Sequence, residues 1–186
     1  MKKLALLSVL AACVVASSLE PVHAASELET WCVAQGAIWQ AGTDTCIILS
    51  AIDATVTGTL ALLSGEILSN HGTINNDGDI YNDGIIDNFG TIGNHGYIHN
   101  ANHMYNYNGG IIDNDGTIDN GGTIYNYNYG TISNYGAVDN DGTIYNYGTF
   151  YNLCMAVFLG SPPSDRIGGV TYNLDNCSFM PMVARG

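Results

Sequence analysis

The chain of 186 residues carries 17 acidic residues, only 4 Lys or Arg, and a formal net charge of −13, with neither Lys nor Arg between Lys3 and Arg166. Nucleic acid is therefore excluded as an expected partner, and anionic membrane surfaces are disfavoured, because both are bound through clustered basic side chains. An acidic, Lys-poor surface suits cations or neutral polar partners such as glycans.

Residues 1–24 have the pattern of a secretory signal peptide, with two Lys before an apolar run and a small-x-small site at Val22-His23-Ala24. We expect cleavage after Ala24 or Ala25 and a secreted or cell-surface protein. The alternative is a lipoprotein signal ending at Cys13, which follows Leu10-Ala11-Ala12. Lipidation of Cys13 would anchor the protein to a membrane in the periplasm or at the surface, although apolar residues continue past it.

Two segments flank the central part of the chain, and each contains a pair of cysteines. In an exported protein an even number of cysteines predicts disulfides. Four cysteines allow three pairings. Position favours Cys32–Cys46 in an N-terminal cap at 25–51 and Cys154–Cys177 in a C-terminal cap or tail at 153–186, because each pair brackets one flank and leaves the centre free of thiols. Free or metal-bound cysteines are the alternative.

The centre, residues 70–152, repeats the pattern Asn-x-Gly-x-Ile-x. An apolar residue fills the Ile place in every unit, and the Gly place fails once, at Asn102. The units that open at Asn106 and Asn126 are longer by two residues and lie three units apart. The structural period is therefore three units, 18 residues plus an optional corner of two.

Three short sides that close a coil predict an all-β fold: a short three-sided parallel β-helix, or β-solenoid, of 18 to 20 residues per coil, with disulfide-bonded flanking segments. Residues 52–69 are expected to form a degenerate first coil. Ile points inward, its neighbours point outward, Asn stacks on Asn in amide ladders, and Gly recurs where corners need an unusual φ.

The stretch "NHGTINNDGDIYNDGIIDNFGTIGNHGYIHN" resembles the Asn-Gly-Ile repeats of bacterial secreted β-helical adhesins, of the filamentous-haemagglutinin and autotransporter-passenger type. The resemblance covers residues 70–152. It implies a β-helical fold and a role at the cell surface. This chain is much shorter than those proteins and carries no recognisable secretion-partner domain.

Outward side chains should form ranks along the solenoid. A predicted aromatic strip combines two ranks of tyrosines, continued by Phe89 and His71: Tyr105, Tyr125, Tyr145 and Tyr107, Tyr127, Tyr147. Aromatic strips of this kind can stack on sugar rings or on a partner protein. Alternatively, the stacked tyrosines only connect successive coils.

A second set of outward residues is acidic and predicts a possible Ca²⁺ site, because stacked carboxylates repel unless a cation lies between them. These residues are Asp113, Asp115, Asp119, Asp139 and Asp141. Their sequence matches neither an EF-hand loop nor a nonapeptide Ca²⁺ repeat. Solvated corner residues are the alternative.

Two further patterns suggest minor alternatives. The spacing of His95, His99 and His103 would place all three on one face of a helix and so suggests a zinc site. On a solenoid with six residues per side, the same three residues point in different directions. An outward rank of threonines, interrupted by Ile111, suggests an ice-binding face as a further alternative. The rank consists of Thr73, Thr91, Thr131 and Thr149.

We expect no enzyme, since polysaccharide lyases of β-helical fold need a basic residue near the cleaved sugar and the repeats contain no Lys or Arg. The sequence favours an exported surface structural or adhesion protein that contacts a glycan or a protein through its tyrosine strip. The main alternative is a self-associating subunit of an extracellular filament, because uncapped solenoid ends expose strand edges.

Overall fold

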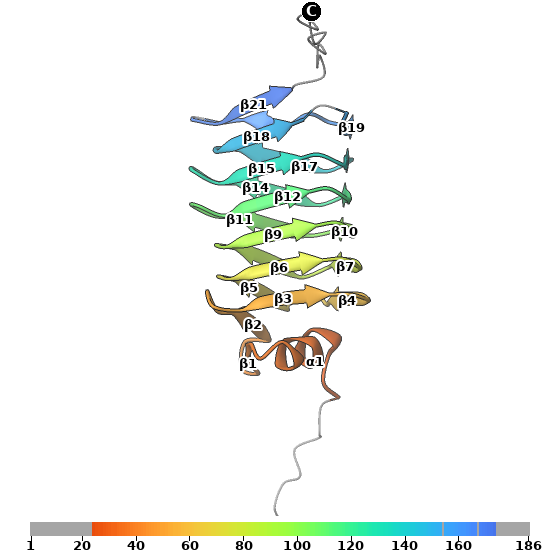
Figure 1. The fold of residues 1–186 in the computed structure, drawn as a ribbon, viewed down its shortest axis with the longest axis vertical. Helices are drawn as coiled ribbons and strands as arrows, with labels where there is room; N and C mark the ends of the chain where they lie inside the picture. Colours follow the sequence, from red (N-terminus) through yellow and green to blue (C-terminus); the bar gives the residue numbers. More distant parts are fainter. Residues whose placement is uncertain (1–23, 154, 167, 174–186) are drawn as a thin grey trace, which may run out of the picture.

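The computed structural model describes residues 24–153, 155–166 and 168–173, and its strands form one three-sided column of parallel sheets (Figure 1). The predicted fold class, an all-β three-sided β-solenoid, is confirmed. Residues one coil apart are separated by 18 or 20 positions, as the two longer units predicted. Residues 1–23 of the predicted signal peptide and both members of the predicted pair Cys154–Cys177 lie outside the described residues.

Each coil adds one short strand to each of three sheets, which we name sheets A, B and C. Sheet A contains β2 (Thr45–Ile48), β5 (Ile67–Asn70), β8 (Ile85–Asn88), β11 (His103–Asn106), β14 (Thr123–Asn126), β17 (Thr143–Asn146) and β20 (Ser164–Asp165). Sheet B contains β3 (Asp53–Val56), β6 (Thr73–Asn76), β9 (Thr91–Asn94), β12 (Ile111–Asn114), β15 (Thr131–Asn134), β18 (Thr149–Asn152) and β21 (Val170–Asn173). Sheet C contains β4 (Thr59–Leu62), β7 (Asp79–Asn82), β10 (Tyr97–Asn100), β13 (Thr117–Asn120), β16 (Ala137–Asn140) and β19 (Val157–Gly160).

The interior is a column of single apolar side chains, one from each strand of the repeats. In the typical strand Thr-Ile-x-Asn, burial alternates, so that Ile and Asn point inward while Thr and x face outward. The buried residues run without a break from Leu28 to Phe150. The first coil has apolar residues at both inward places, for example Leu60 and Leu62 in β4.

The inward Asn residues form three hydrogen-bonded ladders, one beside each corner. Asn94 Nδ2 donates to Asn114 Oδ1 at 2.6 Å, and Asn114 Nδ2 donates to Asn134 Oδ1 at 2.7 Å. Asn94 Nδ2 also donates to the Thr117 carbonyl at 3.0 Å. These side chains are fully buried, so each ladder satisfies amide groups that would otherwise be costly inside the column.

The repeat glycines are required for close packing of coils, and the predicted reason, an unusual φ, is wrong for them. Positive φ among glycines occurs at Gly36, Gly65, Gly109, Gly160 and Gly168, outside the ordinary six-residue units.

In the ordinary units the backbone of one coil lies directly against the next. A Cβ on Gly116 would lie 2.1 Å from the carbonyl oxygen of Gly96, and a Cβ on Gly136 would lie 2.1 Å from that of Gly116. Asn102, the exception in the pattern, donates from Nδ2 to the Asp83 carbonyl at 3.0 Å.

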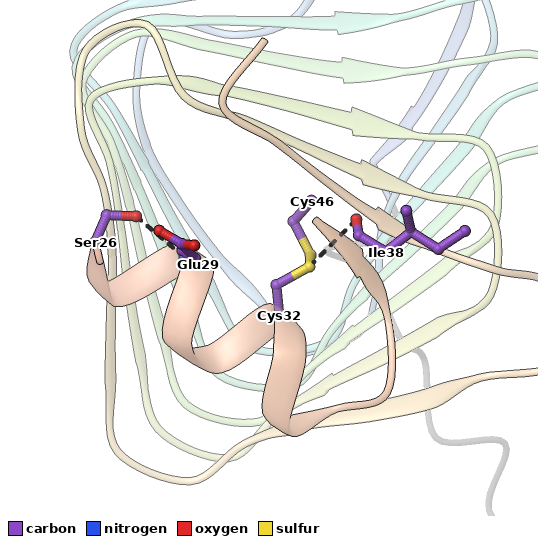
Figure 2. The surroundings of a disulfide bond; sticks show 5 residues. All are labelled: Ser26, Glu29, Cys32, Ile38 and Cys46. Carbon is purple, nitrogen blue, oxygen red and sulfur yellow. Dashed lines mark hydrogen bonds between the residues drawn. A yellow bond between two sulfur atoms is a disulfide. The ribbon is translucent and has the colours of Figure 1, made fainter. Parts of the chain in front are cut away.

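The N-terminal end of the column is closed by α1 (Glu27–Ala34) and β1 (Ile38–Gln40), which lie beneath the first coil (Figure 1). Ser26 caps the helix, because the Glu29 N–H donates to its Oγ at 3.0 Å. The predicted disulfide Cys32–Cys46 is present and joins α1 to β2, with both cysteines fully buried (Figure 2).

Residues of this cap also cover the outer strand of each sheet. In sheet A, β1 pairs with β2 in the antiparallel sense. In sheet B, the Trp31 indole donates to the Thr55 carbonyl at 3.0 Å, and the Thr55 N–H donates to Gln35 Oε1 at 3.0 Å. In sheet C, the Ala61 N–H donates to Glu27 Oε2 at 3.2 Å.

The solenoid extends beyond residues 52–152 at both ends. The strand β2 lies within the segment predicted as the N-terminal cap, and β19, β20 and β21 lie within the predicted C-terminal cap or tail. These strands lack the Asn-x-Gly-x-Ile pattern, which is why the repeat did not reveal them. Among the described residues, no helix is both long and apolar enough to cross a membrane.

Candidate functional site: two tyrosine ladders

The predicted tyrosines form two adjacent ladders at the edge between sheets A and B. Tyr105, Tyr125 and Tyr145 occupy the same outward place in β11, β14 and β17 and are in register; we call them the sheet ladder. The corner ladder consists of the residues that follow the last Asn of each sheet A strand: His71, Phe89, Tyr107, Tyr127 and Tyr147.

Within each ladder the rings stack on one another. In the sheet ladder, ring centroids of successive tyrosines lie 5.1 Å apart at both steps. In the corner ladder the separations rise from 4.3 Å between Phe89 and Tyr107 to 6.0 Å between Tyr127 and Tyr147. The two ladders also touch, with Tyr125 and Tyr127 centroids 5.9 Å apart.

This stacking determines which part of each ring a partner can reach. Because successive rings lie within 28° of parallel in both ladders, their faces cover each other along the strip. The six tyrosines are half-buried, so the exposed part of each is its edge and not its stacked faces, and the Tyr107 hydroxyl is already hydrogen-bonded to Asp87. The strip therefore offers a row of hydrogen-bonding edges, and a ring face is free only where a ladder ends.

The upper end of the sheet ladder is covered by a cation. The Arg166 guanidinium lies 4.5 Å from the centroid of the Tyr145 ring. Arg166 is the only Lys or Arg in the described part of the chain, so this contact uses the single fixed positive charge of that part. A cation–π contact of this kind stabilises the end of the stack.

The lower end of the sheet ladder is acidic. Asp87 pairs with Tyr105 in register, in the place that tyrosine takes in the following coils. Burial raises the pKa of the Asp87 carboxyl, while the Tyr107 hydroxyl and His71 partly offset this effect. Burial and the neighbouring Asp87 raise the pKa of Tyr107 to about 12, and Asp87 Oδ1 is buried without a hydrogen-bond partner in the described structure.

The predicted calcium residues do not converge. Asp119 and Asp139 are in register on sheet C, as expected. Asp113 lies on sheet B, whereas Asp115 and Asp141 lie in the turns before β13 and β17. Within the described residues, no group of three or more His, Cys, Asp or Glu is placed to hold a metal ion.

Histidine and tyrosine side chains contact two of these carboxylates, Asp119 and Asp115. The Tyr97 hydroxyl donates to Asp119 Oδ2 at 2.7 Å, and His99 Nδ1 lies 3.1 Å from the same oxygen. These contacts, the Tyr97 hydrogen bond foremost, hold the pKa of Asp119 below its usual value. His95 lies 3.1 Å from Asp77 and 3.9 Å from Asp115 in the turn between sheets B and C.

The three histidines considered for zinc lie apart, as the six-residue sides predicted. His95 is in a turn, His99 is on sheet C and His103 is on sheet A.

The threonine rank is in register on sheet B but is interrupted by the exposed Ile111. Its outward neighbours, among them Gly93, Asp113 and Ser133, do not form the second Thr column that a flat doublet face would need.

No protein-family model, curated protein or solved structure matches the chain. The resemblance to bacterial adhesins therefore rests on the repeat pattern alone.

Two features of this site did not emerge from the repeat pattern. The first is the stacking of Arg166 on Tyr145, which requires the additional coil formed by β19, β20 and β21. The second is a recess beside Tyr147, lined in part by Tyr129. A signal for it was present, because Gly168-Gly169 repeats the Gly109-Gly110 of an earlier long corner.

Proposed function

We propose that this protein is an exported, non-catalytic surface protein with a structural or adhesive role, which contacts a glycan or a protein through its tyrosine strip. The supporting observation is the pair of stacked ladders, which repeats one half-buried tyrosine at each place in three successive coils. The rigid column holds these hydroxyl-bearing edges at a fixed spacing, so little conformational entropy is lost when a partner binds.

Export is supported by the N-terminal sequence and, weakly, by the disulfide Cys32–Cys46, which is typical of oxidising compartments. Cell fractionation and mass determination of the processed chain test this part of the proposal. A mature chain beginning at Ala25 or Ser26 indicates release. A lipid-modified Cys13, lost in Cys13→Ser, indicates a membrane anchor.

Binding through the strip is tested with the oxidised full chain on glycan arrays and on intact cells. The triple variant Tyr105→Phe, Tyr125→Phe, Tyr145→Phe keeps the stacked rings and removes the hydroxyls. We expect it to lose binding, while Tyr81→Phe, an exposed tyrosine on sheet C, retains it. Equal binding by the triple variant and the unchanged protein would show that the hydroxyl edges are not the contact surface.

End-to-end assembly into a filament is less well supported by the fold. Head-to-tail stacking needs a free strand edge at both ends, and the cap formed by α1 and β1 supplies hydrogen-bond partners to all three sheets at the N-terminal end. Light scattering coupled to size exclusion tests this alternative, and a series of growing oligomers would favour it.

A further inference from the structure

The corner between sheets A and B has two forms. Four of its turns are longer by two residues and closed by the same hydrogen bond, from the fourth residue to the first: Ile52 N to Leu49 O at 2.9 Å, and Gly110 N to Tyr107 O, Gly130 N to Tyr127 O and Gly169 N to Arg166 O, each at 2.8 Å. Between the last two bulges, at 127–130 and 166–169, lies one short corner, at 147–148.

The short corner is set back between its bulged neighbours and so creates a recess of about 340 Å³. Asn128 and Tyr129 line the recess from the preceding coil, and Gly168 lines it from the following coil. Tyr147, Gly148 and Thr149, at the short corner itself and the start of β18, lie between them. Ligand pockets in proteins begin at about this size, on the order of 300 Å³.

Tyr129 occupies a backbone position that favours Gly. Three of the four bulged turns have positive φ at their third residue: 82° at Gly109, 62° at Tyr129 and 89° at Gly168. A bulky side chain in this region is strained, and the other two turns avoid the strain with Gly. Tyr129 is also 83% exposed, so burial in the core does not explain its presence. Strained residues of this kind occur preferentially at functional sites.

Tyr147 contributes a second aromatic ring to the recess. It is the last member of the corner ladder and stacks on Tyr127. Among the described residues, no second ring stacks on Tyr147, in contrast to Tyr127 in the middle of the ladder. Tyr147 is therefore a member of the corner ladder whose second face is not covered by another aromatic side chain.

The lining of the recess is neutral. Among the described residues, it combines two tyrosines with the amide of Asn128, the hydroxyl of Thr149 and two glycines, and these include no carboxylate, Lys or Arg. In a chain with a net charge of −13, this absence of carboxylates disfavours a cationic ligand. The absence of basic groups equally disfavours a phosphate or a carboxylate.

We propose that this recess binds one neutral pyranose ring, as the terminal or exposed residue of a glycan. Aromatic side chains contact the apolar face of a sugar ring, while the amide and hydroxyl groups hydrogen-bond its hydroxyls. This inference deepens the proposed function and rests on it: in addition to the contact along the ladder edge, the end of the corner ladder holds one sugar ring of the same glycan.

The test uses the oxidised full chain and a panel of methyl glycosides of neutral hexoses and N-acetylhexosamines, with binding followed by NMR. We expect ring signals of Tyr129 and Tyr147 to shift on titration with at least one glycoside. Tyr129→Ala should weaken binding about tenfold or more, as expected for loss of an aromatic contact. Tyr135→Ala, at an exposed tyrosine outside the recess, is the matched control and should bind normally.

A second variant separates binding from folding. Tyr129→Gly relieves the strained turn, so we expect a higher Tm together with loss of glycoside binding. Binding retained by Tyr129→Gly or Tyr129→Ala would overturn the proposal.

The outcomes also distinguish the recess from the strip. If the triple Phe variant of the sheet ladder loses glycan binding and Tyr129→Ala does not, the recess proposal is wrong and the strip remains the site. If no glycoside binds, the recess proposal is overturned, and the proposed function then depends on a protein partner.

Discussion

A Cβ atom on Gly96 would lie 2.0 Å from the carbonyl oxygen of Gly78 in the adjacent coil. Gly93, three residues earlier on the same strand and turn, has ordinary space around it, because the nearest atom to a Cβ there is Asn75 Oδ1 at 3.6 Å. A comparison of substitutions at Gly96 and Gly93 therefore tests whether the repeat glycines are required for close packing of the coils.

We expect Gly96→Ala to destabilise the fold by about 1 to 3 kcal/mol, since the coils must separate to admit the methyl group. Gly93→Ala should be neutral or stabilising by about 0.5 to 1 kcal/mol, because Gly weakens a strand interior. Chemical denaturation of both variants measures the difference. Equal effects would show that close packing at Gly96 is not the reason for Gly.

The Asn ladders should contribute to stability through hydrogen bonds that exist only inside the column. Asn114→Ala removes the bonds to Asn94 and Asn134 and leaves buried amide groups unsatisfied, so we expect a loss of about 2 kcal/mol or more. Asn75→Ala, at an outward place in β6, should change stability by less than about 0.5 kcal/mol. Thermal melts measure the stability of both variants. Similar melting temperatures would argue against the Asn ladder as a stabilising element.

The contributions of Asp87 and Asp119 to the free energy of unfolding should change with pH in opposite directions. The folded-state pKa of Asp87 is raised above 3.8, so the native state binds its proton more tightly and stability falls as pH rises through that raised pKa. Asp87→Asn should remove this fall and be more stable than the unchanged protein at pH 7.

For Asp119 the folded-state pKa is lowered below 3.8. Its contribution is present above the unfolded value and is lost as pH falls through the folded value. Asp119→Asn should therefore be less stable at pH 7 and lose this acid dependence. Melting temperatures of both variants and of the unchanged protein between about pH 2 and 8 test these two predictions. If both substitutions changed the pH dependence of stability in the same direction, the opposite pKa shifts of Asp87 and Asp119 would be contradicted.

The disulfide Cys32–Cys46 should stabilise the N-terminal cap. It closes a loop with a sequence separation of 14 residues, for which chain entropy predicts about 3 kcal/mol. The double variant Cys32→Ser, Cys46→Ser should lose this stability, and reduction of the unchanged protein should reproduce the loss. A double variant with unchanged stability would show that hydrogen bonds from α1 hold the cap without the disulfide.

Calcium should have little effect on folding, because the five predicted aspartates are spread over two sheets and two turns. We expect the same melting temperature in calcium and in chelator. A large stabilisation by calcium would require a site that the described residues do not form.

The repeat allowed the solenoid to be predicted from sequence because each strand obeys the same rule. With a period of three units, the in-register pairing of Tyr105 with Tyr125 and of Asp119 with Asp139 follows directly. The ends could not be predicted in this way, since β2 and β19 use residues such as Cys46 and Phe158 in place of the repeat pattern.

The ring contacts within the two ladders could not be predicted from the sequence. Sequence placed Tyr125 and Tyr127 side by side, but only the ring orientations show that their faces are covered by neighbours. The recess likewise depends on where a short corner falls between two long ones, a relation that becomes visible once Gly168 is known to lie in a further coil.

Because every coil presents the same backbone surface above and below, coils are interchangeable units. Duplication of residues 106–125 would insert a coil that continues all three Asn ladders and both tyrosine ranks, with no change to the cap beneath. Each such event would lengthen the column by about 4.8 Å. The number of coils, and with it the reach of the protein, is therefore open to change in evolution by simple gain or loss of repeat segments.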